Sequence, residues 1–236
     1  MNHSSIAVGS MPARSAALGV ETPSMTGPKA VTSRRSLESA EILSRVAIVV
    51  MFTVLAVRIG LDFAETRRAT GLLLLASEAL VVVLTVFRRP TGIVDRSPRA
   101  RLLTTVSLIG PFLVGPAANA TLAPEVVTVL LSACGLCVVI GGKLSLGRSF
   151  GLMPANRGVV STGFYRIVRH PIYMGYLITH VGFLLANATL ANTLIFIGAD
   201  VALMIRAVYE ERVLGRDAAY QQYLQKVRYR VVPGLF

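Results

Sequence analysis

The sequence predicts an all-α fold: a polytopic helical membrane protein with about six transmembrane helices, followed by a cytoplasmic C-terminal amphipathic helix. Two observations carry this prediction. Of the 236 residues, 53% are hydrophobic and only 15% are charged, whereas soluble domains carry about a quarter charged residues. The basic residues also gather in short clusters between long apolar runs. This segregation excludes a nucleic-acid-binding domain, whose positive charge would line one folded face.

Six apolar stretches are long enough to cross a bilayer, which takes roughly 20 helical residues. They lie at about 43–63, 70–87, 102–121, 124–143, 171–189 and 191–209. The run 102–142 contains no Lys or Arg and is too long for one span. Pro111, Pro116 and Pro124 predict a turn within it, so we interpret it as a hairpin of two helices. An alternative with five spans makes 102–142 one span plus a re-entrant piece.

The distribution of basic residues predicts which ends face the cytoplasm. Segments 1–45, 88–101 and 143–169 carry five Lys or Arg each, and 206–236 carries six. The connections near 116–125 and 186–192 carry none. Because cytoplasmic loops are enriched in Lys and Arg, we expect both termini in the cytoplasm. Arg outnumbers Lys 21 to 3, which indicates a GC-rich bacterial genome. For a bacterial protein with several spans, we expect a multi-pass location in the inner membrane.

The segment before the first span differs in composition from the rest. Residues 1–40 are rich in Ser, Gly, Ala, Pro and Thr and contain no apolar run long enough for a signal peptide. This composition predicts a disordered cytoplasmic tail.

Residues 146–175 combine glycines, basic residues and aromatics directly before the fifth span. Pro171 is placed for the first turn of that helix, where its missing N–H costs nothing. The free N–H groups of the helix start, with Arg169 and His170 beside them, predict an anion site at the membrane surface. The alternative interpretation is a basic membrane anchor that precedes a proline-started helix.

A second cluster lies at the end of the sixth span. Glu210 and Glu211 follow it directly, and two carboxylates beside a membrane require a partner. Arg206 lies four residues before Glu210, which is the spacing of a helical ion pair. A ligand's amino group or ribose hydroxyls fit equally well, and the spacing leaves both open. Apolar and aromatic residues recur at helical spacing over 209–227, which predicts an amphipathic helix on the inner surface.

These residues resemble a known family. Residues 169–175, Arg-His-Pro-Ile-Tyr-Met-Gly, look like the RHPxYxG signature of the isoprenylcysteine carboxyl methyltransferase family. The element is shared with membrane sterol reductases and phospholipid methyltransferases. The resemblance spans about residues 144–236. Its other matching parts are Leu146-Gly147, Thr162-Gly163-Phe164-Tyr165, Glu210-Glu211, Tyr220-x-x-Tyr223 and Val232-Pro233.

The resemblance implies a membrane methyltransferase that binds S-adenosylmethionine on its cytoplasmic side and contains no metal. It divides the chain into the tail 1–40, a four-span region 41–143 and a catalytic core 144–236. The residues expected to contact the cofactor are Tyr165, His170, Pro171, Tyr173, Gly175, Glu210 and Glu211.

The expected catalytic residues are Arg169, Arg206 and Glu211. An acceptor carboxylate is already ionised at neutral pH and requires no base, and Arg169 or Arg206 would hold it. An amine acceptor would require a base, for which His170 is the candidate. The expected partners are the lipid bilayer and a lipophilic small molecule or prenylated substrate, with no nucleic acid. A membrane reductase using NADPH and a non-catalytic protein on the same scaffold are the alternatives.

Other polar residues in the predicted spans have simpler interpretations. Glu78, His180 and Asp200 lie inside predicted spans, where ionisable residues are candidates for function. His180 and Asp200 lie deeper than the motif, so we expect these two to make a polar contact between helices. Cys134 and Cys137 have the spacing of a redox pair, but no His, Asp or Glu lies near them. We therefore expect them to be small residues that pack against another helix.

Overall fold

The computed structural model describes residues 39, 42–43, 45–57, 60–61, 64, 69–115, 117 and 121–236. The predicted tail 1–40 lies outside the described residues, except for residue 39, as does most of the 58–68 connection. Residues 42–236 form one compact unit. Its described part is helical and contains no strand, only an isolated bridge between Val94 and Ala155. The predicted all-α class is therefore confirmed.

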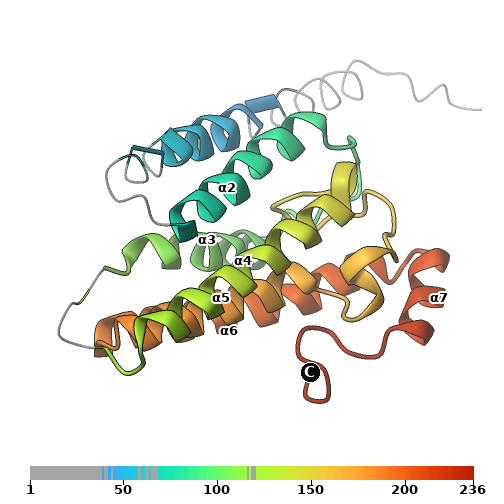
Figure 1. The fold of residues 1–236 in the computed structure, drawn as a ribbon. Helices are drawn as coiled ribbons and strands as arrows, with labels where there is room; N and C mark the ends of the chain where they lie inside the picture. Colours follow the sequence, from blue (N-terminus) through green and yellow to red (C-terminus); the bar gives the residue numbers. More distant parts are fainter. Residues whose placement is uncertain are drawn as a thin grey trace, which may run out of the picture. The chain divides into compact units, whose positions relative to one another are not determined.

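Six labelled α-helices follow a helical segment at Arg45–Val57 (Figure 1). Short 3₁₀ turns occur at Gly147–Ser149 and Gly163–Arg166. The helices are α2 (Ala69–Phe87), α3 (Pro98–Leu113), α4 (Glu125–Leu146), α5 (Pro171–Ala186), α6 (Leu190–Leu214) and α7 (Ala218–Lys226).

Two stretches among the described residues are long and apolar enough to cross a membrane, Glu125–Ser149 and Leu190–Leu214. The helices Arg45–Val57, Leu75–Phe87 and Pro171–Ala186 are apolar but shorter. A helical membrane protein is supported, and the count of six spans stays a prediction.

The run 102–142 holds two separate helices, as the hairpin interpretation expects. The first begins earlier than predicted, at Pro98, because the Ser97 side chain accepts a hydrogen bond from the Ala100 N–H at 3.2 Å and caps the helix. It ends at Leu113, where Val114 is extended. The five-span alternative, one span plus a re-entrant piece, also contains two helical segments, so both span counts stay predictions.

The predicted amphipathic helix over 209–227 is two helices. The first part belongs to α6, which runs on to Leu214, and the chain then turns at Gly215. Asp217 starts α7 by accepting a hydrogen bond from the Ala219 N–H at 2.9 Å. Tyr220 and Tyr223 are buried on one face of α7, while most of its other residues are exposed.

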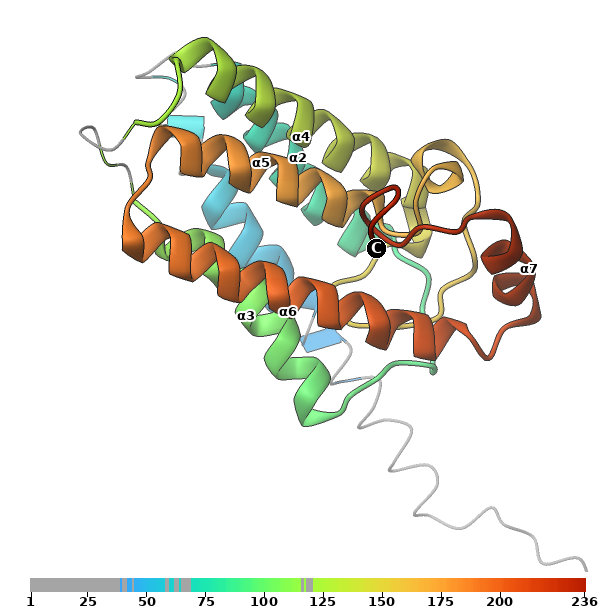
Figure 2. The same cartoon turned by 90° about the horizontal axis from the view of Figure 1, so that it is seen from below.

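The helices pack as two sets. Helix α4 packs against α5 and against α2, and α3 packs against α6 (Figure 2). Consecutive helices α5 and α6 contact each other much less. The α4–α2 contact includes a buried lysine: Lys143 Nζ donates to the Ser77 hydroxyl at 2.8 Å and lies 3.9 Å from Glu78 Oε1. Glu78 thus takes part in a polar contact between α2 and α4.

Glycines allow α4 and α5 to approach closely. A Cβ atom added at Gly175 would lie 2.7 Å from the Gly135 carbonyl oxygen and from a Val139 methyl group. Gly175 therefore lies against α4, which is a packing role and differs from the predicted cofactor contact. Cys134 and Cys137 are exposed, so the expectation that they pack against a helix is wrong. The neighbouring Gly135 and Leu136 are the buried residues.

We expect Gly175→Ala to destabilise the protein by about 1–3 kcal/mol, the usual cost of overpacking a close contact. Thermal unfolding of the purified protein in detergent measures this change. Gly198→Ala is the matched control, because nothing lies within 4 Å of a Cβ at that position of α6. Equal melting temperatures for the two variants would contradict the packing role.

Candidate functional site

The start of α5 joins the C-terminal segment of the chain. Pro171 occupies the first turn of the helix, as predicted, and His170 is the N-cap. The backbone N–H of Arg169 donates to the Tyr229 carbonyl at 3.0 Å, and that of His170 donates to the Arg230 carbonyl at 2.7 Å. The proline lacks an N–H to pair. These two bonds fix residues 229–230 beside the helix start.

Glu211 is held by residues from two distant segments. Arg230 Nε donates to its Oε2 at 2.9 Å, and Arg169 Nη1 lies 3.3 Å from its Oε1. His170 Nε2 lies 3.4 Å from the same Oε1. The Glu211 side chain is 11% exposed, so its charge is compensated mainly by these partners.

Glu210 is held from the opposite side. The Tyr173 hydroxyl donates to its Oε1 at 2.6 Å, and Arg206 Nε donates to the same oxygen at 3.1 Å. Of the two kinds of partner that the spacing leaves open for Glu210, the structure shows Arg206, four residues earlier on α6. His170 Nδ1 lies 3.6 Å from Glu210 Oε2, so this imidazole lies between the two carboxylates.

The structure thus brings together six predicted site residues in one cluster. Arg230 also belongs to it, and the sequence reasoning missed it. Arg230 lies 19 residues after Glu211 in a non-helical segment, so no helical spacing connects the two. In the sequence, Arg230 is one of the six basic residues of 206–236, whose number indicates only that this segment faces the cytoplasm.

Three tyrosines lie beside this cluster. The Tyr223 hydroxyl donates to the Tyr165 carbonyl at 2.7 Å and fixes the loop before α5. The Tyr220 hydroxyl is buried and has no hydrogen-bond partner among the described residues. Burial raises the pKa of all three phenols. They therefore stay neutral at physiological pH.

The loop before α5 is also tied to α7. The Asn156 side-chain amide donates to Asp217 Oδ2 at 2.9 Å, while Asp217 Oδ1 caps α7. The Asn156 hydrogen bond, followed by that from the Ala219 N–H, lowers the pKa of Asp217. The loop and α7 together form the walls of a small cavity.

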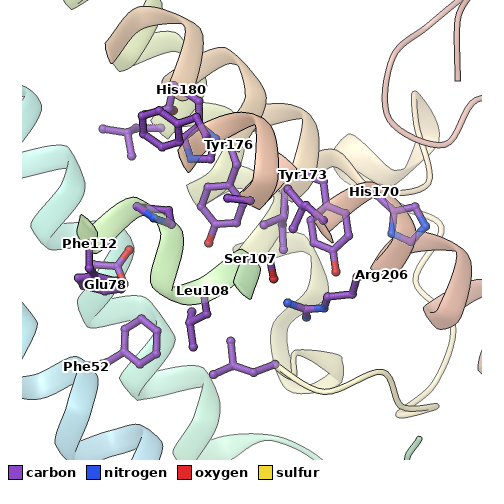
Figure 3. Close-up of a pocket in the computed structure, with 18 of the residues that line it drawn as sticks. Phe52, Glu78, Ser107, Leu108, Phe112, His170, Tyr173, Tyr176, His180 and Arg206 are labelled. Carbon is purple, nitrogen blue, oxygen red and sulfur yellow. The ribbon is translucent and has the colours of Figure 1, made fainter. Parts of the chain in front are cut away.

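Two cavities meet at the cluster. The small one, about 90 Å³, includes Arg169, Tyr220 and Tyr223 in its lining. The large one, about 390 Å³, is lined from Arg45–Val57 and from α2, α3, α4, α5 and α6 (Figure 3). Its walls are mostly apolar, with Arg206 and Tyr173 at the cluster end. The residues that line both cavities are Leu146, Gly151, Tyr165, His170 and Glu210.

We expect Glu211→Ala to loosen the C-terminal segment, because two arginines and His170 lose their common partner. A cost of about 2 kcal/mol, between that of exposed and buried pairs, corresponds to roughly thirtyfold faster amide hydrogen exchange in residues 227–236. Glu125→Ala, at an exposed acidic residue of α4, is the control. Unchanged protection of 227–236 in Glu211→Ala would contradict the proposed anchoring.

Comparison with known families gives one match. Residues 123–221, less than half of the chain, match the family model described as phospholipid methyltransferase. The matched region contains α4, α5, α6 and the start of α7, and with them the residues of the cluster except Arg230. No curated protein matches the chain. The family consists of membrane methyltransferases related to isoprenylcysteine carboxyl methyltransferases, so the match supports a membrane methyltransferase, while the narrower family resemblance stays a prediction.

Proposed function

We propose that the protein is an integral membrane methyltransferase that transfers a methyl group from S-adenosylmethionine to a lipophilic acceptor at the cytoplasmic face of the inner membrane. One observation carries the proposal. The small cavity beside the charged cluster and the large apolar cavity among the helices share Tyr165, His170 and Glu210. A polar cofactor and a lipophilic acceptor bound in the two cavities would therefore meet at these residues.

The residues around the small cavity fit the cofactor. S-adenosylmethionine carries a carboxylate, an ammonium group and ribose hydroxyls. Arg169 matches the carboxylate, and Glu210 matches an ammonium group or a hydroxyl. The Tyr220 hydroxyl supplies a buried polar atom without a partner among the described residues, and such an atom indicates a missing ligand contact.

When bound, the cofactor supplies a methyl group on a positively charged sulfur. The chain's own contribution is to position the acceptor in line with that methyl group and to exclude water. Tyr173 and Arg206 fix the Glu210 carboxylate, and Arg169 and Arg230 fix that of Glu211. His170 is oriented by its place at the N-cap of α5 and by both carboxylates.

We propose that the group that accepts the methyl is a carboxylate of an isoprenoid- or lipid-linked molecule. Arg206 lines the large cavity, and its contacts with Glu210 use Nε and Nη2. Its Nη1 takes no part in these contacts and would hold such a carboxylate. Arg169 is a weaker candidate for the acceptor, because it lines the small cavity and not the large one.

A lipid amine is the second candidate acceptor. The description of the matched family favours it, and so does the position of His170 between two carboxylates, which suits a group that removes a proton from an amine.

We expect Tyr220→Phe to weaken binding of S-adenosylhomocysteine roughly fivefold, the usual value of one neutral hydrogen bond. Its melting temperature should not fall, because the hydroxyl has no protein partner to lose among the described residues. Tyr223→Phe is the matched control and should lower stability by about 1 kcal/mol through loss of the bond to Tyr165. Unchanged affinity in Tyr220→Phe would remove Tyr220 from the cofactor site.

The same binding assay separates the proposal from its alternatives. S-adenosylhomocysteine should stabilise the purified protein against heat, and NADPH should not. Stabilisation by NADPH alone would favour the reductase, and stabilisation by neither would favour a non-catalytic protein.

Labelled-methyl S-adenosylmethionine supplied to membranes containing the protein should transfer label to the lipid extract. A methyl ester releases its label on mild alkaline treatment, whereas a methylated amine retains it. We expect alkali-labile label, with Arg206→Lys lowering transfer by about tenfold or more, because Lys lacks the planar fork of Arg. Label that resists alkali would instead indicate that the acceptor is an amine and not a carboxylate.

A further inference from the structure

Helix α5 places four aromatic rings with polar tips along the large cavity: His170, Tyr173, Tyr176 and His180 (Figure 3). Spacings of three and four residues put them on one face of the helix. The rings of Tyr176 and His180 are nearly parallel, with an interplanar angle of 12°. The first two residues belong to the cluster described above, whereas His180 lies at the other end of the row.

His180 is oriented by a residue of α6. Its Nδ1 lies 2.7 Å from Asp200 Oδ1, and its ring stacks on Phe196 with centroids 4.1 Å apart. A carboxylate at this distance accepts a hydrogen bond from Nδ1–H, and in the neutral imidazole Nε2 is then the acceptor. The contact joins α5 to α6, which confirms the interhelical role predicted for both residues.

The position of His180 on the cavity wall allows a second contact, with a molecule in the cavity, besides its contact with α6. The residue lines the large cavity, where its ring lies against Phe196, which in turn contacts Phe183. A polar nitrogen beside an apolar space is costly unless a donor reaches it. Nδ1 is engaged by Asp200, so a donor on a molecule in the cavity would meet Nε2.

We propose that His180, positioned by Asp200, recognises a hydroxyl group on the methyl acceptor, remote from the atom that is methylated. Ten residues of helix separate His170 from His180, which is roughly 15 Å at about 1.5 Å per residue. The acceptor class is therefore an elongated lipophilic molecule with a reactive polar group at one end and a hydroxyl near this distance from it. This inference rests on the proposed function, since it places the reactive end at the cluster.

The test uses pairs of probes that differ only in a terminal hydroxyl. Fatty acids and ω-hydroxy fatty acids of matched chain length, and the corresponding alkylamines, are titrated into the purified protein loaded with S-adenosylhomocysteine. The wild type should bind the hydroxylated member of at least one series about fivefold more tightly. The preference should peak at the chain length that reaches from Arg206 and Glu210 to His180.

The double variant His180→Phe/Asp200→Leu removes the pair together, because either residue alone would leave a buried polar group unpaired. It should lose the preference for the hydroxylated probe while its affinity for S-adenosylhomocysteine stays unchanged. Phe183→Leu, an apolar change in the same wall, should weaken both members of each pair equally and keep the preference.

A preference that survives in the double variant would overturn the inference, as would equal binding of both probes at every chain length in the wild type. Failure of the proposed function has a different signature, because the wild type would then not bind S-adenosylhomocysteine. The ratio of affinities within each pair separates recognition from a purely structural role, which would alter stability but not that ratio.

Discussion

The charge balance of Glu210 and Glu211 at the end of α6 is the constraint on which the rest of the site depends. Two adjacent carboxylates at the end of an apolar helix are unfavourable unless cations surround them. Arg206 comes from the same helix, Arg169 from the start of α5 and Arg230 from the C-terminal segment. The two glutamates bind an arginine from each of these segments. The cluster therefore also holds α5, α6 and the C-terminal segment together.

The unequal packing of the helices explains why a large cavity exists beside this cluster. Helices α4 and α5 approach closely through Gly135 and Gly175, and α3 packs along α6. Because α5 and α6 contact each other little, side chains from both sets face a shared space. The close packing of α4 on α5 and of α3 on α6, with little contact between α5 and α6, thus leaves room for a lipophilic molecule next to a polar site. The proposed methyl transfer requires this arrangement.

Two groups of polar side chains lie along α5, and the cavity beside them is also lined by Glu78, Ser107 and Tyr176. His170 and Tyr173 lie among the charges of the cluster, while His180 and Asp200 form an isolated pair deeper in the helices. An apolar molecule would make no use of the second pair. The cavity is therefore suited to an acceptor that is lipophilic along most of its length and polar at two separated points.

The sequence by itself determined the helical class, the break of the run 102–142 into two helices and the proline start of α5, because these follow from local spacing and composition. Lys143 and Arg230 count in the sequence only as markers of orientation, yet Lys143 is buried and Arg230 holds Glu211. Only the tertiary structure decided which charges meet, since their partners are far apart in the chain and no periodicity links them. The packing role of Gly175 and the two cavities were decided there for the same reason: they depend on distances between helices, which composition and spacing along one chain do not specify.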